Sequence, residues 1–145
     1  MTISPELIAV VVFTTVVILF AVFVLHIKIP KRLKSDKFAK QWKELQSLCK
    51  DRSTWPEALT QADQLLDKAL KKRRYKGKSM GERMVSAQKV FTDNDAVWFA
   101  HNLYKKVKSE EIKRLKESDV KDALIGFRQA LRDIGALKSD KPGNS

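Results

Sequence analysis

The chain offers few side chains with obvious chemical potential, and His101 is the first of them. It is one of two histidines in 145 residues and the only one outside the apolar N-terminal segment. An imidazole titrates near neutral pH and acts as a general base when a second group orients it. Sequence cannot show such a partner, so a structural histidine is the simpler interpretation. The catalytic alternative combines His101 with Lys105 or Lys106.

Two carboxylates and the only cysteine are the next candidates. Asp63 and Asp67 are four residues apart, a spacing that could place both beside a metal ion on one helix. No histidine or third acid lies near them in sequence, so we predict paired surface acids and no metal site. Cys49 lies on an apolar helical face, where a packed thiol is expected. No GxxxxGK[ST] or other Gly-rich phosphate loop occurs, and no cofactor is predicted.

A run of six basic residues within eight positions could bind phosphates without reading a sequence. The run comprises Lys71, Lys72, Arg73, Arg74, Lys76 and Lys78. Tyr75 lies among them and could stack on a base. The same charges would also suit a helix C-terminus, where cations favour the helix dipole. Nucleic acid, a membrane surface and plain solvated surface therefore all remain open.

Charge and hydropathy divide the chain into two parts. Lys and Arg total 29 against 17 Asp and Glu, a formal net charge of +12. Residues 1–30 contain only Glu6 and Lys28 as charged side chains, so the excess falls on the remainder. One Cys excludes a disulfide scaffold, and five Gly with four Pro exclude collagen-like or Gly/Pro-rich disorder.

Residues 7–29 are predicted to form a transmembrane helix after a short extracytoplasmic N-terminus, 1–6. The 19 residues from Leu7 to Leu25 carry no charge, and as a helix they would be ~28 Å long, close to the hydrocarbon thickness of a bilayer. A cleaved signal peptide would have a basic N-terminal region and a shorter apolar core. The sequence therefore favours an uncleaved anchor, with the lipid bilayer as its first partner.

The basic juxtamembrane linker, predicted over 30–37, sets the orientation. Positive charges after the span and none before it place the C-terminal domain in the cytoplasm and the N-terminus outside, in a bacterial plasma membrane. The linker contains Lys31, Arg32, Lys34 and Lys37. All four, together with the following Lys40 and Lys43, could also attract anionic lipid headgroups.

The cytoplasmic part, 38–138, is predicted to be an all-α antiparallel bundle of four to five helices, followed by a disordered tail, 139–145. Apolar stripes at helical spacing support it, and no strand-like alternation occurs. Capping boxes are predicted at Thr54 with Glu57 and at Ser79 with Glu82. Ser118 is expected to cap the last helix. The helix that opens after Thr92 ends near Ser109 or continues to Lys116.

Three stretches of this bundle resemble bacterial helical-bundle proteins of the HEPN type (higher eukaryotes and prokaryotes nucleotide-binding). They are Trp55-x2-Ala58-x3-Ala62-Asp63-x-Leu65-Leu66-x2-Ala69-Leu70, Tyr75-Lys-Gly77-x2-Met80-Gly-Glu82-Arg83-Met84 and Val97-Trp98-x-Ala100-His101. The resemblance covers roughly residues 38–137 and rests mostly on core positions. The resemblance implies a helical bundle, together with a dimer or a nucleotide-binding surface.

The resemblance also implies where a catalytic motif would lie. Catalytic HEPN members are metal-independent, dimeric ribonucleases that carry Arg-x(4–6)-His. This sequence has Tyr104-Lys105 where Arg-Asn would stand, and Ser109 begins the pair where His-Glu would stand. No Arg lies four to six residues before His101 either. We therefore predict a non-catalytic module that binds itself, a protein partner, RNA or anionic lipid; a membrane-tethered ribonuclease-like protein and a peripheral lipid-binding bundle are the alternatives.

Overall fold

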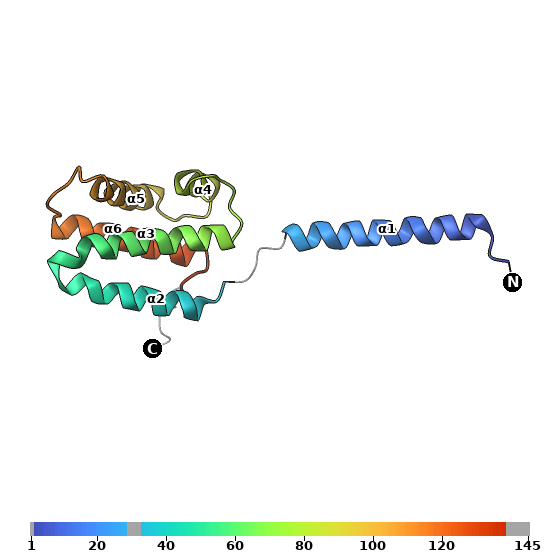
Figure 1. Ribbon diagram of the computed structural model, residues 1–145, viewed down its shortest axis with the longest axis horizontal. Coiled ribbons are helices and arrows are strands. Elements are labelled where there is room, and N and C mark those ends of the chain that lie inside the picture. Colours follow the sequence, from blue (N-terminus) through green and yellow to red (C-terminus); the bar gives the residue numbers. More distant parts are fainter. Residues whose placement is uncertain (1, 29–32, 139–145) are drawn as a thin grey trace. The chain divides into compact units, whose positions relative to one another are not determined.

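The computed structural model describes residues 2–28 and 33–138. The chain divides into two compact units, Met1–Lys31 and Arg32–Ser145. All regular structure in the described ranges is helical, which confirms the all-α fold (Figure 1). The elements are α1 (Pro5–Lys28), α2 (Ser35–Ser47), the 3-10 helices η1 (Leu48–Lys50) and η2 (Arg52–Thr54), α3 (Trp55–Lys72), α4 (Met80–Ser86), α5 (Asn94–Lys108) and α6 (Glu117–Asp133).

The first unit is the single apolar helix α1. Its stretch Pro5–His26 has a mean hydropathy of 3.1, and its apolar side chains are exposed. The hydroxyls of Thr14 and Thr15 donate to carbonyls one turn earlier, so these polar groups are satisfied within the helix. α1 is therefore long and apolar enough to cross a membrane, features that an N-terminal signal sequence shares.

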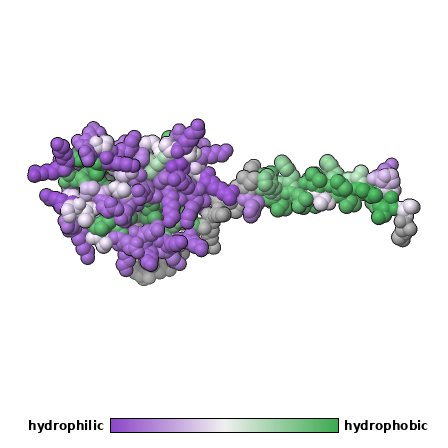
Figure 2. All heavy atoms as spheres, in the orientation of Figure 1, coloured by the Kyte–Doolittle hydropathy of each residue, from purple (hydrophilic) through white to green (hydrophobic). Residues whose placement is uncertain are grey.

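The second unit is a five-helix bundle built around α3, which contacts α2, α4, α5 and α6. Consecutive long helices run antiparallel: α2 with α3, and α5 with α6 (Figure 1). The core is mostly apolar, and its largest fully buried side chains include Phe38, Leu59, Leu66, Phe127 and Leu131. Hydrophilic side chains predominate on the face of this unit seen in Figure 2, whereas the surface of α1 is mostly apolar.

The helix boundaries refine the predicted segments. Leu33 is buried in the core and α2 begins at Ser35, so the bundle starts before the predicted boundary at 38. α5 ends at Lys108, which decides between the two predicted ends. The predicted tail, 139–145, and the linker positions 30–32 lie outside the described residues.

Two of the three predicted helix caps, those at Thr54 and Ser118, are wrong. Thr54 precedes α3 but does not cap it, because its hydroxyl donates to backbone carbonyls of the preceding 3-10 turns. Ser118 does not cap α6, because the helix already begins at Glu117 and places the serine in its first turn. The first error comes from the 3-10 turns that take up the Thr54 hydroxyl, and the second from a helix that begins two residues before the expected start.

The third predicted cap exists in a shifted form. The Ser79 hydroxyl accepts a hydrogen bond from the Glu82 amide at 3.3 Å, as the capping box requires. The Glu82 carboxylate reaches past Ser79 and accepts from the Lys78 amide at 2.6 Å. This arrangement fixes the start of α4, which supplies one side of the pocket described below.

The close crossing of α5 and α6 depends on Gly126. A Cβ at this position would lie 2.6 Å from the Ala96 carbonyl oxygen, a backbone atom that cannot move alone. We expect Gly126→Ala to lower the free energy of unfolding by about 1–3 kcal/mol, the usual cost of overpacking a tight contact. Gly81→Ala is the matched control, since its Cβ would meet Trp98 at an ordinary 3.6 Å. Urea denaturation of residues 33–145 measures both; equal stability of the two variants would contradict this reading of the crossing.

Candidate functional site

An open pocket of about 470 Å³ lies where the start of α4 faces α5, and we call it the His101 pocket. Its lining residues are Ser79, Met80, Gly81, Trp98, His101, Tyr104, Lys105, Lys108 and Ser109. Four of these, from His101 to Lys108, follow the i, i+3, i+4, i+7 spacing of one helix face. The loop before α4 and its first turn, fixed by the Ser79 and Glu82 hydrogen bonds, form the opposite wall.

His101 has an orienting partner that its sequence neighbours do not reveal, the Asp63 carboxylate. The Asp63 carboxylate on α3 lies 2.7 Å from the Nδ1 atom of His101, and both residues are buried. The contact occupies Nδ1 and leaves Nε2 as the polar ring atom available to a ligand. The rings of Trp98 and Tyr104 pack at centroid distances of 6.1 and 6.2 Å from the imidazole and help to hold it in place.

The predicted pair of surface acids is therefore wrong. Asp63 is only 5% exposed and binds His101, whereas Asp67 binds a different cation. The sequence does contain a signal for the burial of Asp63. This residue interrupts the buried stripe of α3, next to Ala62 and one turn from Leu59 and Leu66. A carboxylate in such a stripe needs a buried partner, because an unpaired buried charge is costly.

Burial raises the pKa of the Asp63 carboxyl above its ordinary value of 3.8. The hydrogen bond and charge of His101 act in the opposite direction and offset this only in part, as does the more distant Lys108. Asp67, four residues away, adds a small further rise through its negative charge. The pair is thus less costly to fold when Asp63 carries its proton.

This direction predicts how stability depends on pH. A raised folded-state pKa means that the contribution of Asp63 is fully present below pH ~4 and is lost as pH rises through the folded value. Asp63→Asn keeps an oxygen acceptor for His101 but does not titrate there. We expect the stability of the variant relative to wild type to increase with pH from about 4 towards neutrality. Urea denaturation of residues 33–145 at a series of pH values measures it; a relative loss with rising pH would contradict the raised pKa.

Two lysines give the His101 pocket its positive charge. Lys105 and Lys108 are exposed and line it, and the Lys108 Nζ lies 5.7 Å from the centroid of the Tyr104 ring. Of the two lysines suggested as partners of His101, Lys105 is therefore in place, whereas Lys106 does not line the pocket. All three positions assigned to the degenerate motif by the resemblance, Tyr104, Lys105 and Ser109, lie in this one pocket.

Half-buried Asp67 and buried Arg83 form a second pair, which supports the neighbouring loop. Its Oδ1 accepts from Arg83 Nε at 2.7 Å and lies 2.6 Å from Nη2, while Arg83 Nη1 donates to the Gly77 carbonyl at 2.8 Å. Lys71 approaches Asp67 Oδ2 at 3.0 Å from the exposed side. Within residues 2–28 and 33–138, no group of three or more His, Cys, Asp or Glu is placed to hold a metal ion.

The basic run of residues 71–78 begins at the end of α3 and continues into the loop before α4, and it is separate from the His101 pocket apart from the adjacent Ser79. Lys71 pairs with Asp67, and the Lys72 Nζ lies 5.6 Å from the Phe38 ring centroid. Tyr75 is half-buried against the core, which leaves only part of its ring for a stacked base. The remaining basic side chains of the run do not line the His101 pocket; they are Arg73, Arg74, Lys76 and Lys78.

The other candidate residues that the structure describes do not line the His101 pocket. Lys34 is exposed at the start of α2, and Lys31 and Arg32 lie outside the described residues. Cys49 is half-buried, with its sulfur 3.7 Å from the Leu45 carbonyl oxygen. Burial raises the pKa of its thiol, which makes it a weak nucleophile near neutral pH and fits the predicted packed cysteine.

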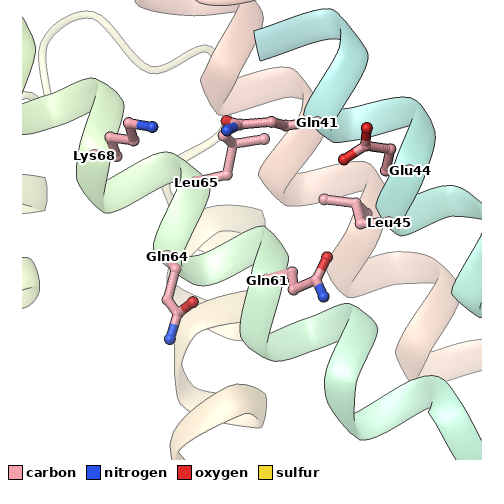
Figure 3. Close-up of a pocket in the computed structure, with 7 residues that line it drawn as sticks. All are labelled: Gln41, Glu44, Leu45, Gln61, Gln64, Leu65 and Lys68. Atoms are coloured by element: carbon pink, nitrogen blue, oxygen red, sulfur yellow. The ribbon is translucent and has the colours of Figure 1, made fainter. Parts of the chain in front are cut away.

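A further groove of about 290 Å³ lies between α2 and α3 (Figure 3). It is lined by Gln41, Glu44, Leu45, Gln61, Gln64, Leu65 and Lys68. Figure 3 shows its amide and carboxylate groups spread over the two helices rather than converging on one point. The groove offers no oriented base, so the His101 pocket is the better candidate site.

The His101 pocket thus combines a buried, oriented imidazole with two lysines and two aromatic rings, a set suited to a ligand that carries negative charge. Its hydroxyl groups, on Ser79 and Ser109, add hydrogen-bond donors at the rim. Comparison with known proteins assigns no family to this arrangement: no family model, no curated protein and no solved structure matches the chain.

Proposed function

We propose that the protein is a single-pass, membrane-anchored helical bundle that binds a phosphate-bearing ligand in the His101 pocket without transforming it. In this proposal α1 spans the cell membrane with its N-terminus outside, and the bundle lies in the cytoplasm. The exposed apolar surface of α1 and the basic residues that follow it support the anchor and its direction. A HEPN-like origin of the bundle remains part of the proposal.

The side chains that line the His101 pocket support the proposal of a phosphate-bearing ligand. Lys105 and Lys108 supply charge for phosphate oxygens, and Trp98 and Tyr104 supply ring surface for a planar group. His101 is fixed by Asp63 at 2.7 Å, so its Nε2 can act as a preorganised hydrogen-bond partner. Fixed side chains lose little entropy on binding, which favours recognition.

Binding is favoured over catalysis by what surrounds the imidazole. Cleavage of a phosphodiester needs a base together with a preorganised cation at the developing negative charge. The cations of the pocket are two exposed lysines. The buried guanidinium of the region, Arg83, is fully engaged by Asp67 and the Gly77 carbonyl.

A membrane-tethered ribonuclease is the second candidate, and the Asp63–His101 hydrogen bond is the observation that favours it. A carboxylate-oriented histidine beside Lys105 could exchange protons with a ribose hydroxyl. RNA turnover that disappears in His101→Ala and persists in Lys106→Gln would establish this alternative. Turnover that His101→Ala leaves unchanged would belong to another source.

The proposed function is tested by binding of a labelled single-stranded RNA to residues 33–145, whose core is formed entirely within the second unit. Binding is measured at about 50 and 150 mM salt, and the same samples are checked for cleavage. We expect retained binding at the higher salt, no cleavage, and a loss of about tenfold in affinity for Lys105→Gln/Lys108→Gln, through the lost phosphate contacts.

The matched control removes two lysines from the basic run instead, Lys71→Gln/Lys72→Gln. These residues do not line the His101 pocket, so a much smaller loss is expected. An equal loss in both double variants would show a general charge effect and would contradict the pocket as the binding site. Cleavage by wild type would overturn the non-catalytic assignment.

A further inference from the structure

A second pocket, of about 370 Å³, lies between α2 and the C-terminal part of the bundle, and we call it the Trp42 pocket. Its lining residues are Ser35, Asp36, Ala39, Trp42, Lys43, Gln46, Arg128, Arg132, Leu137 and Lys138. It shares none of them with the His101 pocket. Nothing in the proposed ligand-binding site uses it.

Cationic side chains dominate this lining. Four are basic, namely Lys43, Arg128, Arg132 and Lys138, and one is a carboxylate, Asp36. The Asp36 side chain is 97% exposed and lies 4.0 Å from the Lys138 Nζ, a loose contact that a stronger anion can replace. Guanidinium groups match the geometry of phosphate oxygens, so the lining favours a phosphate.

Trp42 gives an independent indication of a ligand. The residue is only 6% exposed and lines the pocket, and its indole Nε1 is buried without a hydrogen-bond partner in the described part of the chain. An indole N–H can only donate, and buried donors are almost always paired. A phosphate oxygen among the basic side chains would supply the missing acceptor after a shift of the indole ring that brings Nε1 to the pocket surface.

We propose that the Trp42 pocket binds the phosphate of an anionic phospholipid headgroup, with Ala39 and Leu137 against the apolar part of the lipid. This rests on α1 spanning a membrane, as proposed above. Only six residues separate Lys28 from Ser35, a stretch that extends over at most about 25 Å. A chain tethered so closely meets headgroups at high local concentration, which favours lipid over a soluble phosphate compound.

The test uses the full chain in nanodiscs of phosphatidylcholine, with or without phosphatidylglycerol. In Trp55→Phe/Trp98→Phe, Trp42 is the remaining tryptophan, so its emission reports on this pocket. We expect phosphatidylglycerol to shift the Trp42 emission and the shift to shrink at high salt. Identical emission in the two kinds of disc would overturn the proposal.

Charge variants locate the response. Lys43→Gln/Arg128→Gln removes two pocket cations and should abolish most of the shift. Lys89→Gln/Lys121→Gln removes two exposed lysines that do not line the pocket and should preserve it. An equal response in both double variants would mean a general attraction to the anionic surface and would contradict a site.

Two further arms separate the other outcomes. Glycerol 3-phosphate that reproduces the shift in phosphatidylcholine discs would identify a soluble phosphate compound as the ligand and overturn the lipid assignment. If the tryptophan variants do not fold, phosphatidylglycerol retained by the wild-type chain in detergent is compared with that retained by Lys43→Gln/Arg128→Gln; equal retention would overturn the site. A full chain that does not insert into discs would instead refute the anchor, so the two failures are distinguishable.

Discussion

Deletion of residues 2–28 is expected to move the protein from the membrane fraction to the soluble fraction. The deleted segment contains the apolar helix α1, which has 19 consecutive uncharged residues. The apolar side chains of this helix are exposed. Each central Leu, Ile, Phe or Val favours insertion by roughly 0.3–0.6 kcal/mol, and together they outweigh the polar ends. The bundle retains its complete core, so the soluble fragment should remain helical by circular dichroism.

Alkaline extraction of membranes measures this effect, with intact mass determined on the same protein. Thr14→Leu/Thr15→Leu is the matched control: it keeps the helix length, removes its two hydroxyl groups and should stay in the membrane. Full-length protein that alkaline conditions release would contradict a span. A mass that lacks the N-terminal segment would show a cleaved signal sequence instead of an anchor.

Arg83→Ala should be among the most destabilising substitutions in the bundle, at about 3 kcal/mol, because it leaves the Asp67 carboxylate without its buried partner. The guanidinium makes contacts of 2.6–2.8 Å with Asp67 and the Gly77 carbonyl, and the residue is 7% exposed. Loss of the last contact also releases the loop that precedes α4. The wall of the His101 pocket formed by Ser79 to Gly81 should become disordered at the same time.

Lys71→Gln provides the comparison, because it removes the other cation bound to Asp67. The Lys71 side chain is 60% exposed, and such surface pairs contribute about 0.3–0.5 kcal/mol. Urea denaturation of residues 33–145 measures both variants. Similar losses of stability would show that the Arg83 contacts are no stronger than a surface pair.

The helical bundle could be predicted from the sequence because its stripes are long and regular. Phe127 and Leu131, for example, are four residues apart in the last helix, the spacing of one helix face, and are fully buried. The starts of helices were harder, since two 3-10 turns before α3 divert the Thr54 hydroxyl to other carbonyls. A local pattern cannot show which carbonyls a neighbouring turn leaves open.

Half of the candidate site was also predictable. His101, Tyr104, Lys105 and Lys108 share a helix face by spacing alone, so finding any one of them indicates the others. The pairing of His101 with Asp63 spans 38 residues and depends on how α3 packs against α5. Because the sequence does not show that Asp63 contacts His101, it supports only the expectation of a structural histidine.

The most direct test of the account is NMR of the histidine in residues 33–145, where His101 is the only one. Nitrogen-15 signals of the imidazole report its tautomer, and we expect the proton on Nδ1, donated to Asp63, with the Nε2 signal shifting when single-stranded RNA is added. Asp63→Asn should change the Nδ1 signal before any ligand is present. RNA that binds while both imidazole signals stay unmoved, with shifts confined to the amides of residues 71–78, would contradict the His101 pocket as the ligand site.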